Sequence, residues 1–194
     1  MTTSTRYQAE APAHPICAEL AANLQARTSW EQPAQLYWLL TNTDGSVSLQ
    51  ELLPAEFFLI EGTRPPEVLA AFAEFLCLTN PLRQRDVPAG FTGLAFFAEA
   101  WTVHAENMDG QQLKQLDADV LAHRIAKRDD RIEARVMWGL DRDRAQYWAM
   151  QPRGNEVHAL RLETQYPLVG SGAVIDSLTT MLDVIAGMEA DPNI

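Results

Sequence analysis

The chain has 194 residues, 47% of them hydrophobic, and a formal net charge of −11 at pH 7. A chain of this size buries enough apolar surface to fold without a disulfide or a structural metal. The excess of carboxylates argues against a nucleic-acid-binding protein, because phosphate contacts require clustered lysines and arginines. We therefore expect no nucleic-acid partner.

The sequence also argues against a membrane or secreted protein. The longest uncharged stretches, 32–43 and 87–98, are much shorter than the about 20 apolar residues that cross a bilayer. The polar first residues lack the basic and hydrophobic regions of a signal peptide. Cys17 and Cys77 each fall in a helix-like apolar pattern and are interpreted as hydrophobic filling rather than a disulfide or a catalytic thiol. We expect a cytoplasmic protein.

Residues 1–13 are predicted to be a flexible N-terminus, and 14–190 a single α+β domain. Four helices are predicted within it from apolar side chains spaced three and four residues apart. The predicted ranges are 15–27, 64–79, 111–128 and 172–187, with Thr63 and Ser171 as N-caps and Gly187 as the end of the last helix.

The strands are predicted from alternating patterns and turn residues. Residues 94–103 are apolar on both alternating faces, which is typical of a strand in the middle of a sheet. Asp44-Gly45 between two apolar runs predicts a hairpin, and residues 131–140 alternate apolar and polar side chains at the start of a three-strand meander. A short additional strand is predicted in the segment EFFLIEG, 56–62.

The order of these elements is α-β-β-α-β-α-β-β-β-α. Hairpins in place of βαβ units predict an α+β fold with a mainly antiparallel sheet of about five to six strands and helices packed on one face. The polar side chains of 131–140 predict that the other face is partly open to solvent.

One pattern resembles a known group of proteins. Glu99-Ala100-Trp101 ends an aromatic strand, and it is followed by the segments RIEAR, 131–135, and GLDRD, 139–143. This combination is similar to uncharacterised proteins of actinobacteria and actinobacteriophages. The family carries no activity that can be transferred to this chain, so the resemblance implies an origin more than a function. A phage origin would favour an accessory protein that acts on a host protein.

The candidate polar cluster consists of Glu99, His104 and Glu133. We interpret Glu99 and Arg135 as a cross-strand ion pair, and acid-base catalysis in a cleft is the alternative. His104 and Glu106 match the H-x-E motif of zinc deaminases, but the cysteine pair of those enzymes is missing. We predict no catalytic residue, no metal ligand and no cofactor.

The basic residues are concentrated in one part of the chain, since 9 of the 15 lie between 124 and 161. Arg131 and Arg135 are predicted on the polar side of a strand, with Arg142 and Arg144 at the tip of the following hairpin. Together they predict one exposed surface that makes forked contacts with the carboxylates of a protein partner or of a second copy. The alternative is a solvated face neutralised by its own carboxylates.

Three functions fit these observations. The first is a non-enzymatic protein-binding or regulatory accessory protein, and the absence of nucleophile, metal and phosphate motifs favours it. The second is a small-molecule hydrolase or ligand-binding enzyme with a carboxylate and histidine site. The third is an acidic chaperone-like domain that holds a client protein.

Overall fold

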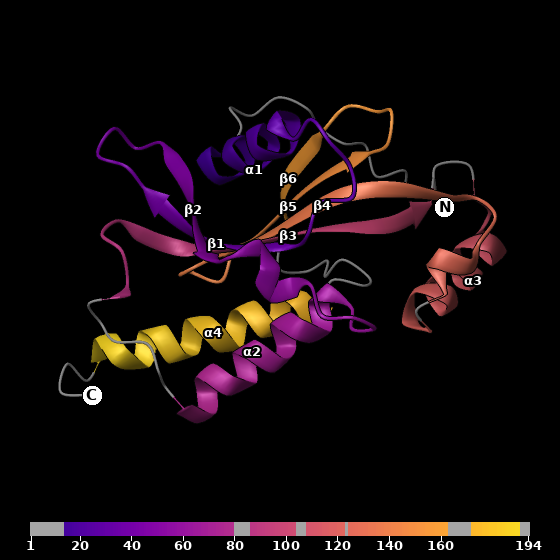
Figure 1. Cartoon of the computed structure of the whole chain (residues 1–194). Helices are drawn as coiled ribbons and strands as arrows, with labels where there is room; N and C mark the ends of the chain where they lie inside the picture. The colour runs from indigo at the N-terminus through magenta and orange to yellow at the C-terminus, as the bar shows by residue number, and fades with distance from the viewer. Residues whose placement is uncertain (1–13, 80–85, 104–107, 123, 163–171, 191–194) are drawn as a thin grey trace.

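The computed structural model describes residues 14–79, 86–103, 108–122, 124–162 and 172–190 (Figure 1). The described residues form one antiparallel sheet of six strands in the order β2-β1-β3-β4-β5-β6. The elements are α1 Pro15–Ala26, β1 Gln35–Thr41, β2 Val47–Leu53, η1 Ala55–Phe58, α2 Pro65–Thr79, β3 Phe91–Val103, α3 Gly110–Leu121, η3 Ile125–Lys127, β4 Arg131–Asp141, β5 Gln146–Pro152, β6 His158–Leu162 and α4 Gly172–Ala190. The predicted α+β class and antiparallel sheet are confirmed.

β3 is a central strand, as its two apolar faces predicted. It pairs with β1 on one edge and with β4 on the other. Phe96 points into one hydrophobic core and Phe97 into the core on the opposite face, and both are fully buried. Gly93 is required where β4 approaches most closely, because a Cβ there would lie 2.8 Å from Asp141 Cα and closer still to the carbonyl of Leu140.

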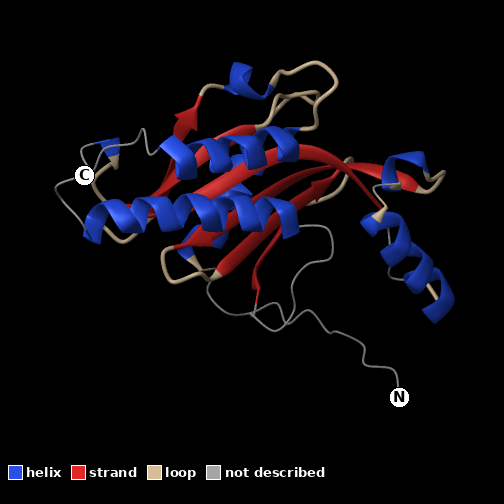
Figure 2. Cartoon of the chain, turned by 90° about the horizontal axis from the view of Figure 1, so that it is seen from below, coloured by secondary structure: helices blue, strands red, loops and turns tan. Residues whose placement is uncertain are grey.

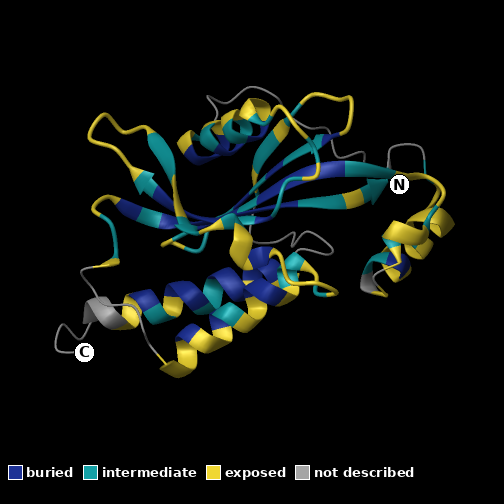
Figure 3. Ribbon diagram, in the orientation of Figure 1, coloured by how far each residue is buried: buried dark blue, intermediate teal, exposed yellow. Residues whose placement is uncertain are grey.

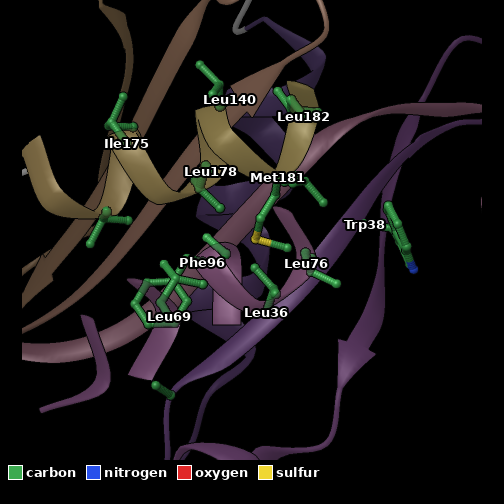
Figure 4. Close-up of a cluster of buried hydrophobic side chains, with 14 of the residues drawn as sticks. Leu36, Trp38, Leu69, Leu76, Phe96, Leu140, Ile175, Leu178, Met181 and Leu182 are labelled. Atoms are coloured by element: carbon green, nitrogen blue, oxygen red, sulfur yellow. The ribbon is translucent and has the colours of Figure 1, made fainter. Parts of the chain in front are cut away.

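The helices cover both faces of the sheet, which corrects the expectation that they pack on one face. Figure 1 shows α1 on one side and the pair α2 and α4 on the other, and Figure 2 shows α2 and α4 running side by side across the sheet. Leu69 of α2 and Met181 of α4 meet Phe96 in the larger core (Figure 4). α1 packs on the opposite face with Leu20 and Leu24 buried, so the middle of this face is covered. The face is open only in part, since Trp101 and Arg131 at the end of the β3–β4 ladder are exposed.

Three predictions of element type or length were wrong. The predicted helix 111–128 ends at Leu121, where the carbonyl of Asp119 accepts the N–H of Arg124, and Ile125–Lys127 form the separate 3-10 helix η3. The segment EFFLIEG contains the 3-10 helix η1 in place of a strand, and its Phe58 packs against Phe96 with ring centroids 5.5 Å apart. A short apolar run does not distinguish a strand from a buried helical turn. α4 continues through Gly187 to Ala190, because this glycine does not take the positive φ of a helix-ending residue.

Other boundaries agree more closely. Gly45 has a φ of 83° in the β1–β2 turn, as the Asp-Gly pair predicted. α2 begins at Pro65, one residue later than predicted from Thr63. The predicted flexible N-terminus, 1–13, and the predicted N-cap Ser171 lie outside the described residues. None of the helices in the described ranges has the length and apolar character that a membrane span requires.

Candidate functional site

Glu99 and Arg135 face each other across the β3–β4 ladder, and Arg135 Nε lies 3.6 Å from Glu99 Oε1. The predicted cross-strand ion pair is therefore confirmed. The predicted exposure of Arg135 is wrong, because this residue is only 2% exposed. The face of β4 that carries it is covered by the connection between α1 and β1.

Residues 27–32 of this connection, which we call the strap, cross directly over the ion pair. Arg135 Nη1 donates to the backbone carbonyl of Arg27 at 2.6 Å, and Nη2 donates to the carbonyl of Ser29. The guanidinium therefore binds the backbone of a segment that lies about a hundred positions earlier in the chain. Arg135 Nε is buried and makes no hydrogen bond within the described residues.

Glu99 binds the other half of the strap. Its Oε2 accepts the backbone N–H of Glu31 at 2.8 Å, and its Oε1 accepts the N–H of Gln32 at 3.3 Å. Glu31 has a φ of 64°, which turns these two N–H groups toward the carboxylate. The pair holds one segment of backbone by both its carbonyl and its N–H groups.

The side chains of the strap add cation-π contacts to this anchor. The ring of Trp30 lies 4.3 Å from the Arg135 guanidinium carbon and 5.0 Å from that of Arg153. Arg153 in turn forms an ion pair with Glu133. Glu133 of the predicted polar cluster is therefore paired with Arg153, which follows β5, and does not form a catalytic pair with Glu99.

Arg27, the first residue of the strap, forms a second group of polar contacts beneath α1. Its guanidinium carbon lies 3.4 Å from the centre of the Phe97 ring, and burial lowers the pKa of Arg27. Burial likewise raises the pKa of Tyr37, whose hydroxyl accepts from Arg27. The other acceptors of Arg27 are Asn23 at 3.0 Å, Gln32 at 2.6 Å and Gln35 at 2.7 Å. These uncharged acceptors stabilise the guanidinium inside the fold.

Arg142 and Arg144 lie elsewhere, at the β4–β5 turn beside the second half of α4. They line a cavity of about 110 Å³, which we call the arginine pocket. Its lining residues are Phe91, Arg142, Arg144, Leu182, Ile185 and Ala186. Arg144 Nη1 donates to the Thr179 carbonyl at 3.1 Å, and its Nη2 pairs with Asp183. The pocket is thus lined by both apolar side chains and guanidinium groups.

The four predicted arginines do not form one surface, which corrects the predicted partner-binding face. Arg131 lies at the other end of β4 from the turn, with its guanidinium carbon 4.9 Å from the ring of Trp101. Strand alternation places Arg131 and Arg135 on the α1 side, whereas the turn places Arg142 and Arg144 beside α4. The structure brings together only the last two.

The basic residues before β4 pair locally. Arg124 and Arg128 both bind Asp119 of α3, with nitrogen to oxygen distances of 3.0 and 2.8 Å. The hydrogen bond from Arg128 lowers the pKa of Asp119. Arg128 also binds Asp130 at 2.7 Å, so these cations close the α3–η3 turn.

A second buried polar group joins residues that sequence reasoning did not connect. Tyr147 donates its hydroxyl to Asp141 Oδ2 at 2.7 Å, and His14 Nε2 lies 3.3 Å from the same hydroxyl. Burial raises the pKa of Tyr147 strongly. His14 also accepts the N–H of Ile16 and caps α1. No local sequence signal connects these residues, and their contacts tie α1 to the β4–β5 hairpin.

The remaining candidates fall outside the described structure. His104 and Glu106 lie in the range 104–107, which is not described. Among the described residues, no three histidine, cysteine or acidic side chains gather closely enough to hold a metal ion. Comparison of the chain with protein-family models, with curated proteins and with solved structures found no match in any of the three. The geometry alone therefore provides the functional argument.

Proposed function

We propose that the protein is a non-enzymatic binding protein that regulates or occupies a partner protein, and that the partner docks at the arginine pocket. The observation on which the proposal depends is the combination of pocket size and lining. Its apolar lining comes from Phe91, Leu182, Ile185 and Ala186, and Arg142 and Arg144 line it with two guanidinium groups.

The size of the pocket favours a protein partner over a metabolite. Its volume is about 110 Å³. Sites for drug-sized ligands occupy roughly 300–1,000 Å³. A pocket of this size suits one aliphatic side chain, and a single anchor residue in an apolar pocket is typical of protein interfaces.

The two arginines of the pocket determine which residues of the partner lie beside that anchor. Guanidinium groups form forked hydrogen bonds with carboxylates, which they bind better than other surface groups. Arg144 uses two of its donors on Thr179 and Asp183, and the half-exposed Arg144–Asp183 pair is weak enough to be exchanged for a partner's carboxylate. The partner segment therefore presents an aliphatic residue next to an aspartate or glutamate.

The hydrolase alternative has less support. A catalytic carboxylate requires an open position beside it, but Glu99 accepts two backbone N–H groups and pairs with Arg135. The free thiols Cys17 and Cys77 favour a reducing compartment, so we place the binding function in the cytoplasm.

The test is affinity capture from a native lysate with three baits, followed by quantitative mass spectrometry. The baits are the wild type, Ala186→Phe and Ala173→Phe. Residues 173 and 186 are both exposed alanines of α4, but only the second lines the pocket. A phenylalanine at 186 fills the pocket without entering the core, and the same change at 173 is the matched control.

We expect a partner that the wild type and Ala173→Phe capture equally and that Ala186→Phe loses, with all three baits melting at similar temperatures. Capture that is equal for all three baits would place the docking surface elsewhere. Turnover of a small molecule that Glu99→Gln abolishes, without loss of folding, would revive the hydrolase alternative.

A further inference from the structure

Exposed large apolar side chains are concentrated in one segment of the chain. Among the described residues, seven such side chains are exposed, and five of them belong to η1, the turn after it, and α2. These five are Phe57, Leu59, Ile60, Phe75 and Leu78, which we call the α2 surface. Leu78 is 77% exposed and Leu59 is 67% exposed. A group of exposed apolar side chains of this kind often marks a binding surface.

The two parts of this surface are joined by a direct contact. The ring of Phe57 meets the ring of Phe72 edge-on, with centroids 5.3 Å apart. Phe75 and Leu78 follow Phe72 at intervals of three residues, so they continue the apolar strip along α2. Figure 3 shows the outward side of α2 exposed where α4 does not cover it. The Phe57–Phe72 contact therefore links η1 to the exposed side of α2.

The exposed charges around the strip are mainly acidic. Glu56, Glu61, Glu67 and Glu74 are exposed along η1, the turn and α2. The basic residue of this region, Arg64, already forms an ion pair with Glu67. An apolar strip with an acidic border is complementary to a segment that is apolar on one side and basic at its margins.

We infer that the α2 surface binds a basic amphipathic helix of a partner protein. The apolar side of such a helix covers Phe57, Phe75 and Leu78, and its flanking lysines or arginines reach Glu74, which is exposed on α2. Helix-in-groove binding of this kind uses anchors three, four and seven residues apart, which matches an elongated strip better than a single pocket. This surface is distinct from the arginine pocket, where the complementary partner segment is acidic.

The same charges disfavour two other occupants. A second copy that packed its α2 surface against this one across a twofold axis would bring two identical acidic borders together, and like charges repel. An anionic membrane would be repelled for the same reason, because membrane-binding surfaces carry lysines and arginines beside their apolar residues. The acidic border therefore selects a basic protein segment.

The experiment uses a model peptide of about 18 residues, or five helical turns, made of leucine and lysine with an amphipathic helical pattern. Its matched control replaces every lysine by glutamate. Each fluorescently labelled peptide is titrated with the full-length protein, and binding is followed by fluorescence anisotropy at two salt concentrations. We expect the lysine peptide to bind and the glutamate peptide not to bind.

Variants locate the binding surface. Phe75→Ser combined with Leu78→Ser removes two exposed apolar side chains without touching the core, and it should weaken binding about tenfold or more. Leu113→Ser changes an exposed leucine of α3 and is the control for a general loss of apolar surface. Glu74→Gln should weaken binding and reduce its salt dependence, because it removes one carboxylate from the border.

Three results would overturn the inference. One is equal binding of the lysine and glutamate peptides, and another is unchanged binding by Phe75→Ser with Leu78→Ser. The third is a dimer in light scattering that this same double variant converts to a monomer, since a second copy would then occupy the surface. Ala186→Phe should leave peptide binding unchanged, so the two docking surfaces are tested separately.

Discussion

Arg135→Met is the substitution that most clearly separates the structure from a reading of the sequence alone. The alternating pattern of β4 predicts an exposed arginine, for which loss of the charge would change the free energy of unfolding by less than about 0.5 kcal/mol. The structure instead buries the guanidinium among the Arg27 carbonyl, the Ser29 carbonyl and the carboxylate of Glu99.

The magnitude follows from what the methionine leaves behind. The side chain of Glu99 is only 13% exposed, so its carboxylate would remain nearly buried without a counter-charge. Breaking a buried ion pair by removing one partner costs about 3–5 kcal/mol. Two strap carbonyls also lose their donor, although the strap can reach solvent and recover part of that loss. We therefore expect Arg135→Met to destabilise the protein by about 3 kcal/mol or more.

The assay is urea denaturation followed by circular dichroism, with Arg131→Met as the matched control. Arg131 is exposed on the same face of β4 and contacts Trp101, so its loss should cost at most about 1 kcal/mol. Adding Glu99→Leu to Arg135→Met should cost less than the sum of the single changes by about 1–3 kcal/mol. Equal and small effects of the two arginine substitutions would refute the strap and restore an exposed Arg135.

Three further predictions test the fold. In the same urea assay, Gly93→Ala should destabilise the protein by about 1–3 kcal/mol, because the added Cβ meets the β4 backbone. Gly187→Ala should stabilise it by about 0.5–1 kcal/mol, because a Cβ at this position of α4 meets no neighbouring atom. Trp138→Ala should cost roughly 2–4 kcal/mol in the calorimeter, slightly less than for a fully buried tryptophan, because the ring is partly buried against the larger core. Because Arg128 lowers the pKa of Asp119, the stability that this pair adds is complete above the ordinary aspartate pKa of about 3.9 and is lost as pH falls through the lowered value. Asp119→Asn should therefore melt below the wild type at pH 6, and a difference that persists unchanged at the lowest pH would count against this ion pair.

The elements that the sequence predicted well are those whose signals are local. The two apolar faces of 94–103 required a strand covered on both sides, and the structure places helices on both sides of β3. A strand with two apolar faces needs helices on both sides of the sheet, so this pattern already contradicted the prediction that the helices pack on one face. Asp44-Gly45 and the cross-strand pairing of Glu99 with Arg135 were likewise determined by neighbours in the ladder.

The elements that it missed depend on segments distant in the chain. The period of 131–140 shows which face Arg135 is on, but not that residues 27–32 cover that face. The arginine pocket is assembled from β3, the β4–β5 turn and α4, and no spacing in the sequence connects these three elements. Burial of a charged side chain is unusual enough that sequence patterns predict it as exposed.

The most direct test of the central claim is the affinity of a purified captured partner for the wild type and for Ala186→Phe, measured by isothermal titration calorimetry. If an aliphatic side chain of the partner enters the arginine pocket, filling the pocket should weaken binding about tenfold or more, whereas Ala173→Phe should bind as the wild type does. Equal affinities of Ala186→Phe and the wild type would contradict docking at this pocket.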